Sequence, residues 1–160
     1  MNRTRRQEIA GFAGFLLLCL AVSALGGLAT SSSVGTWYPT LAKPSFNPPD
    51  WVFAPVWTTL YIVMAIAGWR VWRTPNAQLR THALSVFYVQ LALNLLWSIL
   101  FFGLQAIGLA LAEIIVLLVA IIITMVLSWR VDRLAGMLFL PYTLWVAFAS
   151  LLNAAIFALN

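Results

Sequence analysis

WYPTLAKPSFNPPDWVFAPVW, residues 37–57, interrupts a chain that is otherwise almost continuously apolar. Five of the seven prolines of the chain lie in this stretch. Proline ends helices and biases the residue before it toward extended backbone. The stretch therefore predicts a stiff, ordered loop, and Pro48 and Pro49 suit the first turn of a following helix. Residues 37–51 are called the lid below, and a lid implies something beneath it to cover.

The composition of the whole chain indicates the medium in which it folds. Of its 160 residues, 63% are hydrophobic and 8% are charged, whereas a soluble domain carries roughly 25% charged residues. Nine basic and four acidic side chains are too few to cover the surface of a water-soluble fold. The apolar segments run for about 20 residues without the period-two alternation of outer-membrane barrels. The chain is therefore predicted to be an all-α membrane protein.

The apolar segments predict a bundle of five transmembrane helices with a proline-rich extramembrane loop between the first two. The expected spans are residues 9–29, 51–72, 83–102, 109–129 and 134–159, and Pro141 is expected to kink the last. A polar hinge, 73–82, and tight turns at 103–108 and 130–133 join the later spans. The first run exceeds the 7–15 apolar residues typical of a signal peptide, so it is predicted to be retained. Short connections and the lack of an internal repeat indicate a single domain, residues 1–160.

The basic residues predict how the bundle lies in its membrane. With five spans, Lys43 falls on the side of the lid, and the other side receives all the arginines: Arg3, Arg5, Arg6, Arg70, Arg73, Arg80, Arg130 and Arg133. By the positive-inside rule, the N-terminus is cytoplasmic and the lid and C-terminus are outside. This asymmetry favours the cytoplasmic (inner) membrane, with the outer membrane as the alternative. Because the basic residues are scattered singly, we expect no nucleic-acid partner.

Polar and aromatic side chains recur at one depth beneath the lid. At about 1.5 Å per residue, Trp57, Tyr61, Asn94 and Glu113 lie roughly 9–15 Å below that surface, and Trp145 lies near mid-membrane. Polar groups in a span face inward because lipid cannot satisfy them. They could serve only to bind neighbouring helices, and the indoles could be ordinary core. Together they are typical of an apolar small-molecule site, and several aromatic rings suit a flat aromatic ligand.

Other chemistry is poorly supported. The only histidine, His82, falls in the hinge, away from the expected cavity, and no cluster has metal-ligand spacing. We therefore predict no metal site. Cys19, within an apolar run, is expected to be a packing residue. The remaining small residues in the first span, Gly11, Gly14, Gly26 and Gly27, predict close helix contacts.

Four segments carry a resemblance to a known family. They are WYPTLAKPSFNPPDWVFAPVWTTLY (37–61), FYVQLALNLLWSILFFG (87–103), GLALAEI (108–114) and LPYTLWVAFASLLN (140–153). In order and spacing they resemble the TspO/MBR family, which comprises tryptophan-rich sensory proteins, the translocator protein and the peripheral benzodiazepine receptor. The resemblance covers essentially the whole chain. It implies five helices around a pocket under the first loop, commonly in a homodimer.

The resemblance also implies ligands and site residues. Expected ligands are porphyrins such as protoporphyrin IX, haem, and isoquinoline-carboxamide or benzodiazepine-type compounds, with no obligatory cofactor. The positions that match the ligand-contacting residues of the family are Tyr38, Pro48, Trp57, Tyr61, Asn94, Trp97, Phe101, Trp145 and Ala149. No catalytic residue is assigned, although Trp57 and Trp145 match a pair implicated in porphyrin photodegradation. The basic residue that animal members require for cholesterol is absent after Arg133, so cholesterol transport is not carried over.

Three functions follow as hypotheses. The first is an integral membrane sensor or transport protein that binds a tetrapyrrole in a tryptophan-lined pocket, with Asn94 as a polar anchor. The second is an enzyme that degrades porphyrin with light and oxygen through Trp57 and Trp145. The third is a small-molecule transporter that uses the intramembrane carboxyl of Glu113.

Overall fold

The computed structural model describes residues 4–160, so that Arg3, counted above for orientation, lies outside the described residues. Within this range five helices are long and apolar enough to cross a membrane, and no strand is present. They are α1 (Arg5–Val34), α2 (Phe53–Arg73), α3 (Ala77–Ser98), α4 (Ile107–Val131) and a last span divided into α5 (Arg133–Leu138) and α6 (Leu140–Leu159). The prediction of an all-α membrane protein is confirmed.

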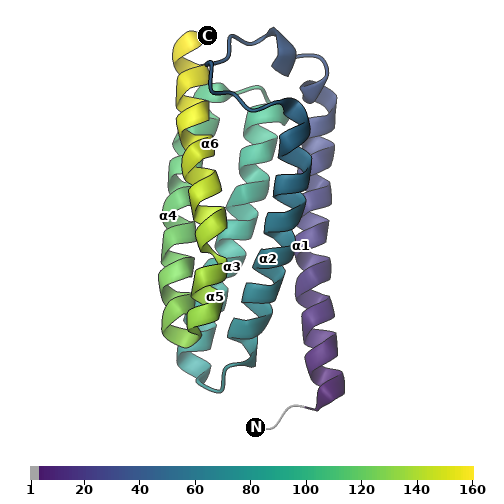
Figure 1. Ribbon diagram of the computed structural model, residues 1–160, viewed down its shortest axis with the longest axis vertical. Coiled ribbons are helices and arrows are strands. Elements are labelled where there is room, and N and C mark those ends of the chain that lie inside the picture. Colours follow the sequence, from purple (N-terminus) through teal and green to yellow (C-terminus); the bar gives the residue numbers. More distant parts are fainter. Residues whose placement is uncertain (1–3) are drawn as a thin grey trace.

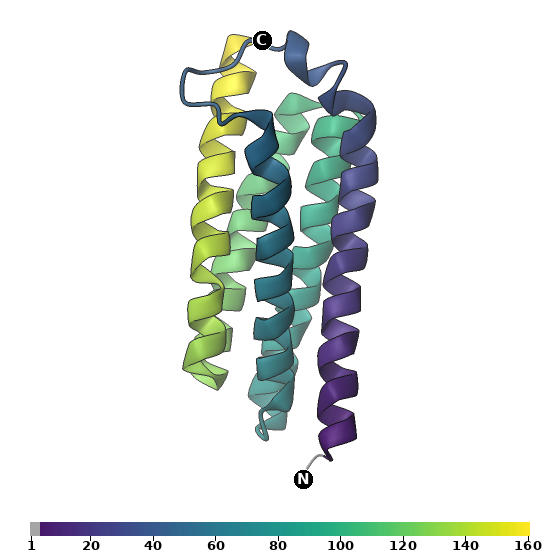
Figure 2. The same ribbon diagram turned by 45° about the vertical axis from the view of Figure 1, so that its right-hand side comes forward.

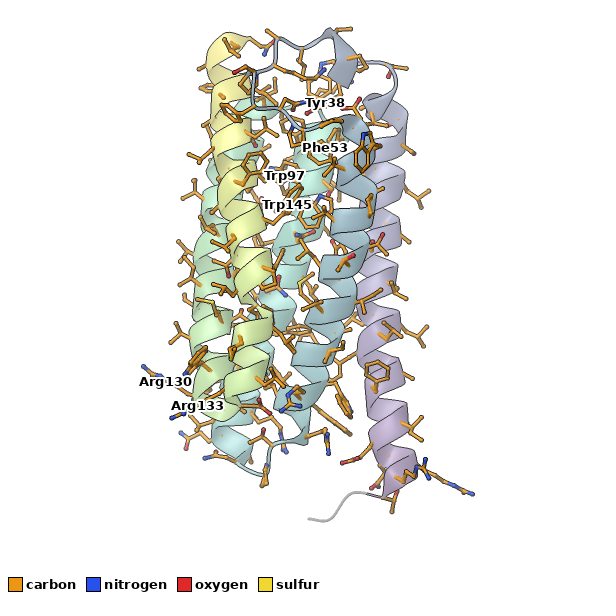
Figure 3. All side chains as sticks on the ribbon, viewed as in Figure 1. Tyr38, Phe53, Trp97, Arg130, Arg133 and Trp145 are labelled. Carbon is orange, nitrogen blue, oxygen red and sulfur yellow. The ribbon has the colours of Figure 1, made fainter. Side chains whose placement is uncertain are left out.

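The helices form an upright bundle whose two ends differ (Figure 1). The N-terminus lies at one end, and the lid crosses the other end beside the C-terminus. Helix α1 packs on α2, α3 on α4, and α4 on α6. The connection after α2 is short, and so is the one after α4, which places consecutive spans antiparallel. All arginines that Figure 3 labels lie at the end remote from the lid.

Helix ends depart from the predicted spans where local capping extends them. Helix α1 begins at Arg5 because Thr4 and Gln7 form a capping box, with Gln7 N–H donating to Thr4 Oγ1 at 3.3 Å. The predicted hinge 73–82 is wrong in its second half, since Asn76 Oδ1 accepts the Leu79 N–H at 3.1 Å and starts α3 at Ala77. Only residues 74–76 remain outside helices there.

Proline places the boundaries of the lid differently from the prediction. Pro49 precedes a single 3₁₀ turn, Asp50–Val52, and Pro55 rather than Pro48 or Pro49 stands in the first turn of α2. The expectation for those two prolines is therefore wrong. Pro141 lies in the first turn of α6, directly after the break at Phe139, so the interruption predicted for the last span is confirmed.

Glycines divide into two kinds. Gly11 faces the Trp72 ring and Gly26 faces Ser98, so close helix contacts are confirmed at both. At Gly14 and Gly27 the prediction is wrong, because a Cβ there would meet nothing within 4 Å. The sequence could not distinguish the two glycines in contact from the two in open space, because this depends on the direction in which each faces around the helix axis.

Ion pairs join the helix ends remote from the lid. Arg70 and Asp132 approach to 2.8 Å, and Asp132 Oδ1 also accepts the Ala135 N–H at 3.0 Å, capping α5. Burial opposes ionisation of Asp132, but the Ala135 N–H and the Arg70 guanidinium hold its pKa below the usual value. The pair thus fixes the corner between α4 and α5 against α2.

We expect Asp132→Asn to lower stability by about 1 kcal/mol or less at neutral pH, because the pair is partly exposed. The amide keeps an oxygen for the Ala135 cap, so the variant removes the charge and the acceptor that Arg70 uses while leaving the cap in place. Since the folded pKa is depressed, this stabilisation is complete above the unfolded pKa of about 3.9 and is lost as pH falls below it. Thermal unfolding in detergent at pH 7 and pH 3 checks this. Wild type should approach the variant at pH 3, and a constant difference would contradict the pair's role.

Candidate functional site

A cavity of about 540 Å³ lies beneath the lid, within the range of about 300–1,000 Å³ usual for ligand pockets. Its wall comes from α1, the lid, α2, α3 with the π-helical turn Ile99–Gly103 that follows it, and α6. Figure 3 labels Tyr38 in the lid and, at increasing depth beneath it, Phe53, Trp97 and Trp145. The aromatic lining comprises Tyr38, Phe53, Trp57, Tyr61, Trp97, Phe101, Phe102 and Trp145.

The two indoles that matter most for a flat guest are held by other rings. Trp57 on α2 packs against Tyr61 with ring centroids 6.0 Å apart. Trp145 on α6 meets Phe53 edge-on at 6.0 Å and Phe148 at 5.7 Å. Edge-to-face and offset contacts of this kind favour one orientation of each ring. The indoles are therefore oriented by the protein before any ligand binds.

A buried hydrogen-bonded chain begins at two residues of the cavity lining, Tyr61 and Asn94, and continues to two residues outside it, Tyr142 and Gln90. Tyr61 on α2 donates its hydroxyl to Asn94 Oδ1, and Asn94 Nδ2 donates to the Tyr142 hydroxyl oxygen at 2.8 Å. Tyr142 in turn donates to Gln90 Oε1 at 3.0 Å. The chain joins α2, α3 and α6, and its side chains are all buried. Asn94 thus links the three helices with one lone pair and one N–H. Its other amide N–H and its second oxygen lone pair remain available to a guest.

The lid is tied together from within. The Tyr38 hydroxyl donates to Asn47 Oδ1 at 2.8 Å, and the Lys43 ammonium lies 4.5 Å from the Tyr38 ring centroid. Burial, with the carboxylate of Asp50 as a second cause, raises the pKa of Tyr38 to about 12. Tyr38 therefore stays neutral and remains a hydrogen-bond donor across the physiological pH range.

The lid is also tied to α6. Asn160 Oδ1 accepts the Ala42 N–H and Asn160 Nδ2 donates to the Ala42 carbonyl, both at 3.0 Å. Phe46 of the lid meets Phe148 of α6 edge-on at 6.3 Å. These contacts hold the middle of the lid over the cavity rather than leaving it free in solvent.

The structure brings eight of the nine predicted ligand-binding residues into the cavity lining: Tyr38, Trp57, Tyr61, Asn94, Trp97, Phe101, Trp145 and Ala149. Pro48 lies in the lid, where its carbonyl accepts from Asn47 at 2.9 Å, and is not part of the lining. Sequence reasoning missed the contribution of α1, which is given by Ser23, Gly26, Gly27, Thr30, Ser31 and Val34. A signal was available, because these small residues recur every three or four positions.

Glu113 is buried on α4 but is not among the residues that line the cavity. Neither of its carboxyl oxygens has a hydrogen-bond partner within the described chain. The indole N–H of Trp145 is likewise buried without a partner there, but Trp145 does line the cavity. An acceptor atom on a guest would satisfy that donor.

The cavity lining contains few charged groups. Asp50, at the lid, is the one charged side chain among the described lining residues. Across residues 4–160 there is no group of three or more His, Cys, Asp and Glu residues that could hold a metal ion. A concave apolar space with oriented rings and few polar groups is the usual form of a small-molecule site.

Comparison with known proteins identifies the family. The model of the TspO/MBR family matches residues 15–159, which include every element of the cavity wall. The chain belongs to the TspO/MBR family. Being a TspO/MBR protein with five apolar spans, it is an integral, multi-pass membrane protein.

Relatives within the TspO/MBR family are similar along most of their length. The tryptophan-rich protein TspO of Archaeoglobus fulgidus is 43% identical over 145 residues, which cover 91% of this chain and 94% of the relative. Protein CrtK of Rhodobacter capsulatus is 38% identical, covering 93% and 92%. The human translocator protein is 37% identical, covering 78% and 75%. The resemblance read from the sequence is therefore confirmed at the level of the family.

Proposed function

We propose that this protein binds a tetrapyrrole, a porphyrin or haem, in the cavity beneath the lid and acts as a membrane sensor or transport protein for it. The observation that carries the proposal is that Trp57 of α2 and Trp145 of α6 line one cavity of about 540 Å³. A planar macrocycle offers two large faces for contact with these indoles. Isoquinoline-carboxamide and benzodiazepine-type compounds are flat aromatic molecules that suit the same space.

Polar groups at the edges of the cavity favour a guest with polar substituents. The unpartnered indole N–H of Trp145 and the remaining amide N–H of Asn94 are donors that a ring nitrogen or a carboxylate could accept. Tyr38 covers the cavity from the lid. The names of two relatives, a tryptophan-rich sensory protein of Cereibacter sphaeroides and the translocator protein of Homo sapiens, point to sensing or transport.

The setting of the site is part of the proposal. We propose that the arginine-rich end faces the cytoplasm and the lid faces outward from the cytoplasmic membrane. The positive-inside rule supports this orientation, since Arg70, Arg73, Arg130 and Arg133 lie at the end remote from the lid. The broad apolar outer faces of α1 and α4 are exposed and suit either acyl chains or a second copy in a homodimer.

The test is a titration of the protein in lipid nanodiscs with protoporphyrin IX in the dark, followed by quenching of tryptophan emission. We expect saturable quenching. We expect the double variant Trp57→Phe, Trp145→Phe to lose affinity by roughly tenfold, about 1.4 kcal/mol, because each phenyl ring covers less of the guest than an indole and the Trp145 N–H donor is lost. Trp129→Phe is the control, since Trp129 lies exposed near the other end of the bundle. Equal affinity in the double variant and the control would remove the site assignment. A new product absorbing differently from porphyrin under light would instead favour degradation.

A further inference from the structure

The cavity wall between α1 and α2 changes along the bundle. At the end remote from the lid the two helices are in direct contact. Trp69 donates its indole N–H to the Glu8 carbonyl at 3.1 Å, and a Cβ on Gly68 would lie 2.8 Å from the Phe15 ring. Here α1 closes the side of the bundle tightly.

Toward the lid, α1 leans on α3 and its π-helical extension instead. Ser33 Oγ donates to the Phe102 carbonyl at 2.5 Å, and a Cβ on Gly26 would lie 3.3 Å from the Ser98 hydroxyl. Figure 2 shows α1 and α2 running apart as they approach the lid. Near the lid, therefore, α1 and α2 do not pack closely on each other, and a gap lies between them.

Both edges of this gap carry small residues that line the cavity and are also exposed. They are Gly27 and Ser31 on α1 and Ala54 and Thr58 on α2. Each pair is four positions apart and so lies on one face of its helix. The cavity is not fully closed, and exposed lining residues on facing edges of α1 and α2 indicate where its wall is open. We call the opening between these four residues the portal.

The portal lies at the depth of acyl chains. At about 1.5 Å per residue, Gly27 is about 11 Å and Ser31 about 17 Å from the middle of α1, while the hydrocarbon core of a bilayer extends about 15 Å from its centre. The portal therefore begins among the acyl chains and ends at the headgroup boundary. The two hydroxyl groups at the portal are suited to contact with lipid. Thr58 donates to the Ala54 carbonyl at 2.8 Å, and Ser31 donates to the Leu28 carbonyl at 2.9 Å. With their donors satisfied within the helix, both can face lipid at little cost.

The route from water is obstructed by comparison. A guest entering there must displace the lid, which is tied by the Tyr38–Asn47 bond and by the paired bonds between Asn160 and Ala42. Entry through the portal breaks none of these hydrogen bonds, because the residues that border it have small side chains. At Gly27 a Cβ would meet nothing within 4 Å.

We propose that the cavity is filled from the bilayer, through the portal, by a planar amphiphile dissolved in the lid-side leaflet. This inference rests on the proposed function and narrows its ligand class. The guest has a flat apolar body that partitions into acyl chains and a polar edge that stays near the headgroups. Its concentration in the leaflet, not in water, then sets the rate at which the site fills.

The test is stopped-flow quenching by protoporphyrin IX in nanodiscs, comparing wild type with Gly27→Phe. The added ring fills open space at the portal, so both association and dissociation should slow by at least about tenfold, a barrier change of about 1.4 kcal/mol. A variant that only weakened the site would dissociate faster instead. In wild type, the filling rate should follow the ratio of porphyrin to lipid.

The control is Gly14→Phe, on the same helix, where a Cβ also meets nothing within 4 Å and which lies outside the cavity lining. It should keep the wild-type rates. Wild-type rates in Gly27→Phe, or a rate that follows aqueous porphyrin alone, would overturn the portal.

A second arm needs no porphyrin and separates failure of the portal from failure of the proposed function. Phosphatidylcholine brominated in its acyl chains quenches indoles on contact. We expect it to quench wild type and Gly14→Phe more than Gly27→Phe, and the difference should vanish when Trp57 and Trp145 are phenylalanine. Equal quenching in all three would overturn the portal. If porphyrin gave no saturable quenching of wild type, the proposed ligand would be wrong. The brominated-lipid experiment would still show whether the portal opens to the bilayer.

Discussion

Ala149→Phe is expected to abolish porphyrin binding while the protein remains folded. Ala149 lies on α6 one helical turn from Trp145 and lines the cavity. A phenyl ring there occupies part of the 540 Å³ in which the guest must fit. Affinity should fall by at least about a hundredfold, equivalent to about 2.7 kcal/mol, because the clash acts against the bound state alone. The fold should tolerate the ring, since it enters existing space rather than a filled core.

Leu151→Phe provides the matched control. Leu151 lies two positions further along α6 with 67% of its surface exposed, so its phenyl ring would face lipid. Titration with protoporphyrin IX should give wild-type affinity for this variant and no saturable quenching for Ala149→Phe. If Ala149→Phe bound as tightly as wild type, the guest would have to lie elsewhere.

Gly136→Ala is expected to be the most destabilising small substitution in the bundle. A Cβ at Gly136 would lie 2.7 Å from both Cα and Cβ of Trp129 and 2.8 Å from its backbone nitrogen. Backbone atoms cannot rotate away, so α5 would have to separate from the end of α4. We expect a loss of about 2–3 kcal/mol, although alanine gains about 1 kcal/mol in helix propensity over glycine.

Thermal unfolding in detergent, followed by near-ultraviolet circular dichroism, measures this effect. At roughly 2–4 °C per kcal/mol for a chain of this size, the midpoint should fall by about 4–12 °C. Gly14→Ala is the control, because its Cβ would stand in open space and the change should be neutral or slightly stabilising. A Gly136→Ala midpoint equal to that of wild type would mean that the α4–α5 corner is not closely packed.

The sequence predicted the parts of this structure that depend on distance along the chain. Runs of about 20 apolar residues located every span, and prolines located the lid. The rise per residue placed Trp57 and Trp145 at compatible depths, and both line one cavity. Helix ends were less predictable, because caps such as Thr4 and Asn76 act over a few residues and extend a span beyond its apolar run.

Direction around a helix axis was the information that the sequence lacked. Glu113 was predicted to lie with the other polar groups beneath the lid, yet α4 contributes nothing to the described lining. Asn94 was predicted to anchor a ligand, but Tyr61 and Tyr142 occupy part of its hydrogen-bonding capacity. These partners come from two other helices, so no spacing within α3 could reveal them. The separation of α1 from α2 near the lid has the same origin, since it depends on how three helices pack together.

The central claim is that a flat guest binds between the indoles of Trp57 and Trp145 beneath the lid. A structure of the protein with protoporphyrin IX in nanodiscs tests it most directly. The account predicts one macrocycle inside the cavity, in contact with Trp57 and Trp145 and covered by Tyr38. A macrocycle lying on the outer, lipid-facing surface, with the cavity left without a guest, would contradict it.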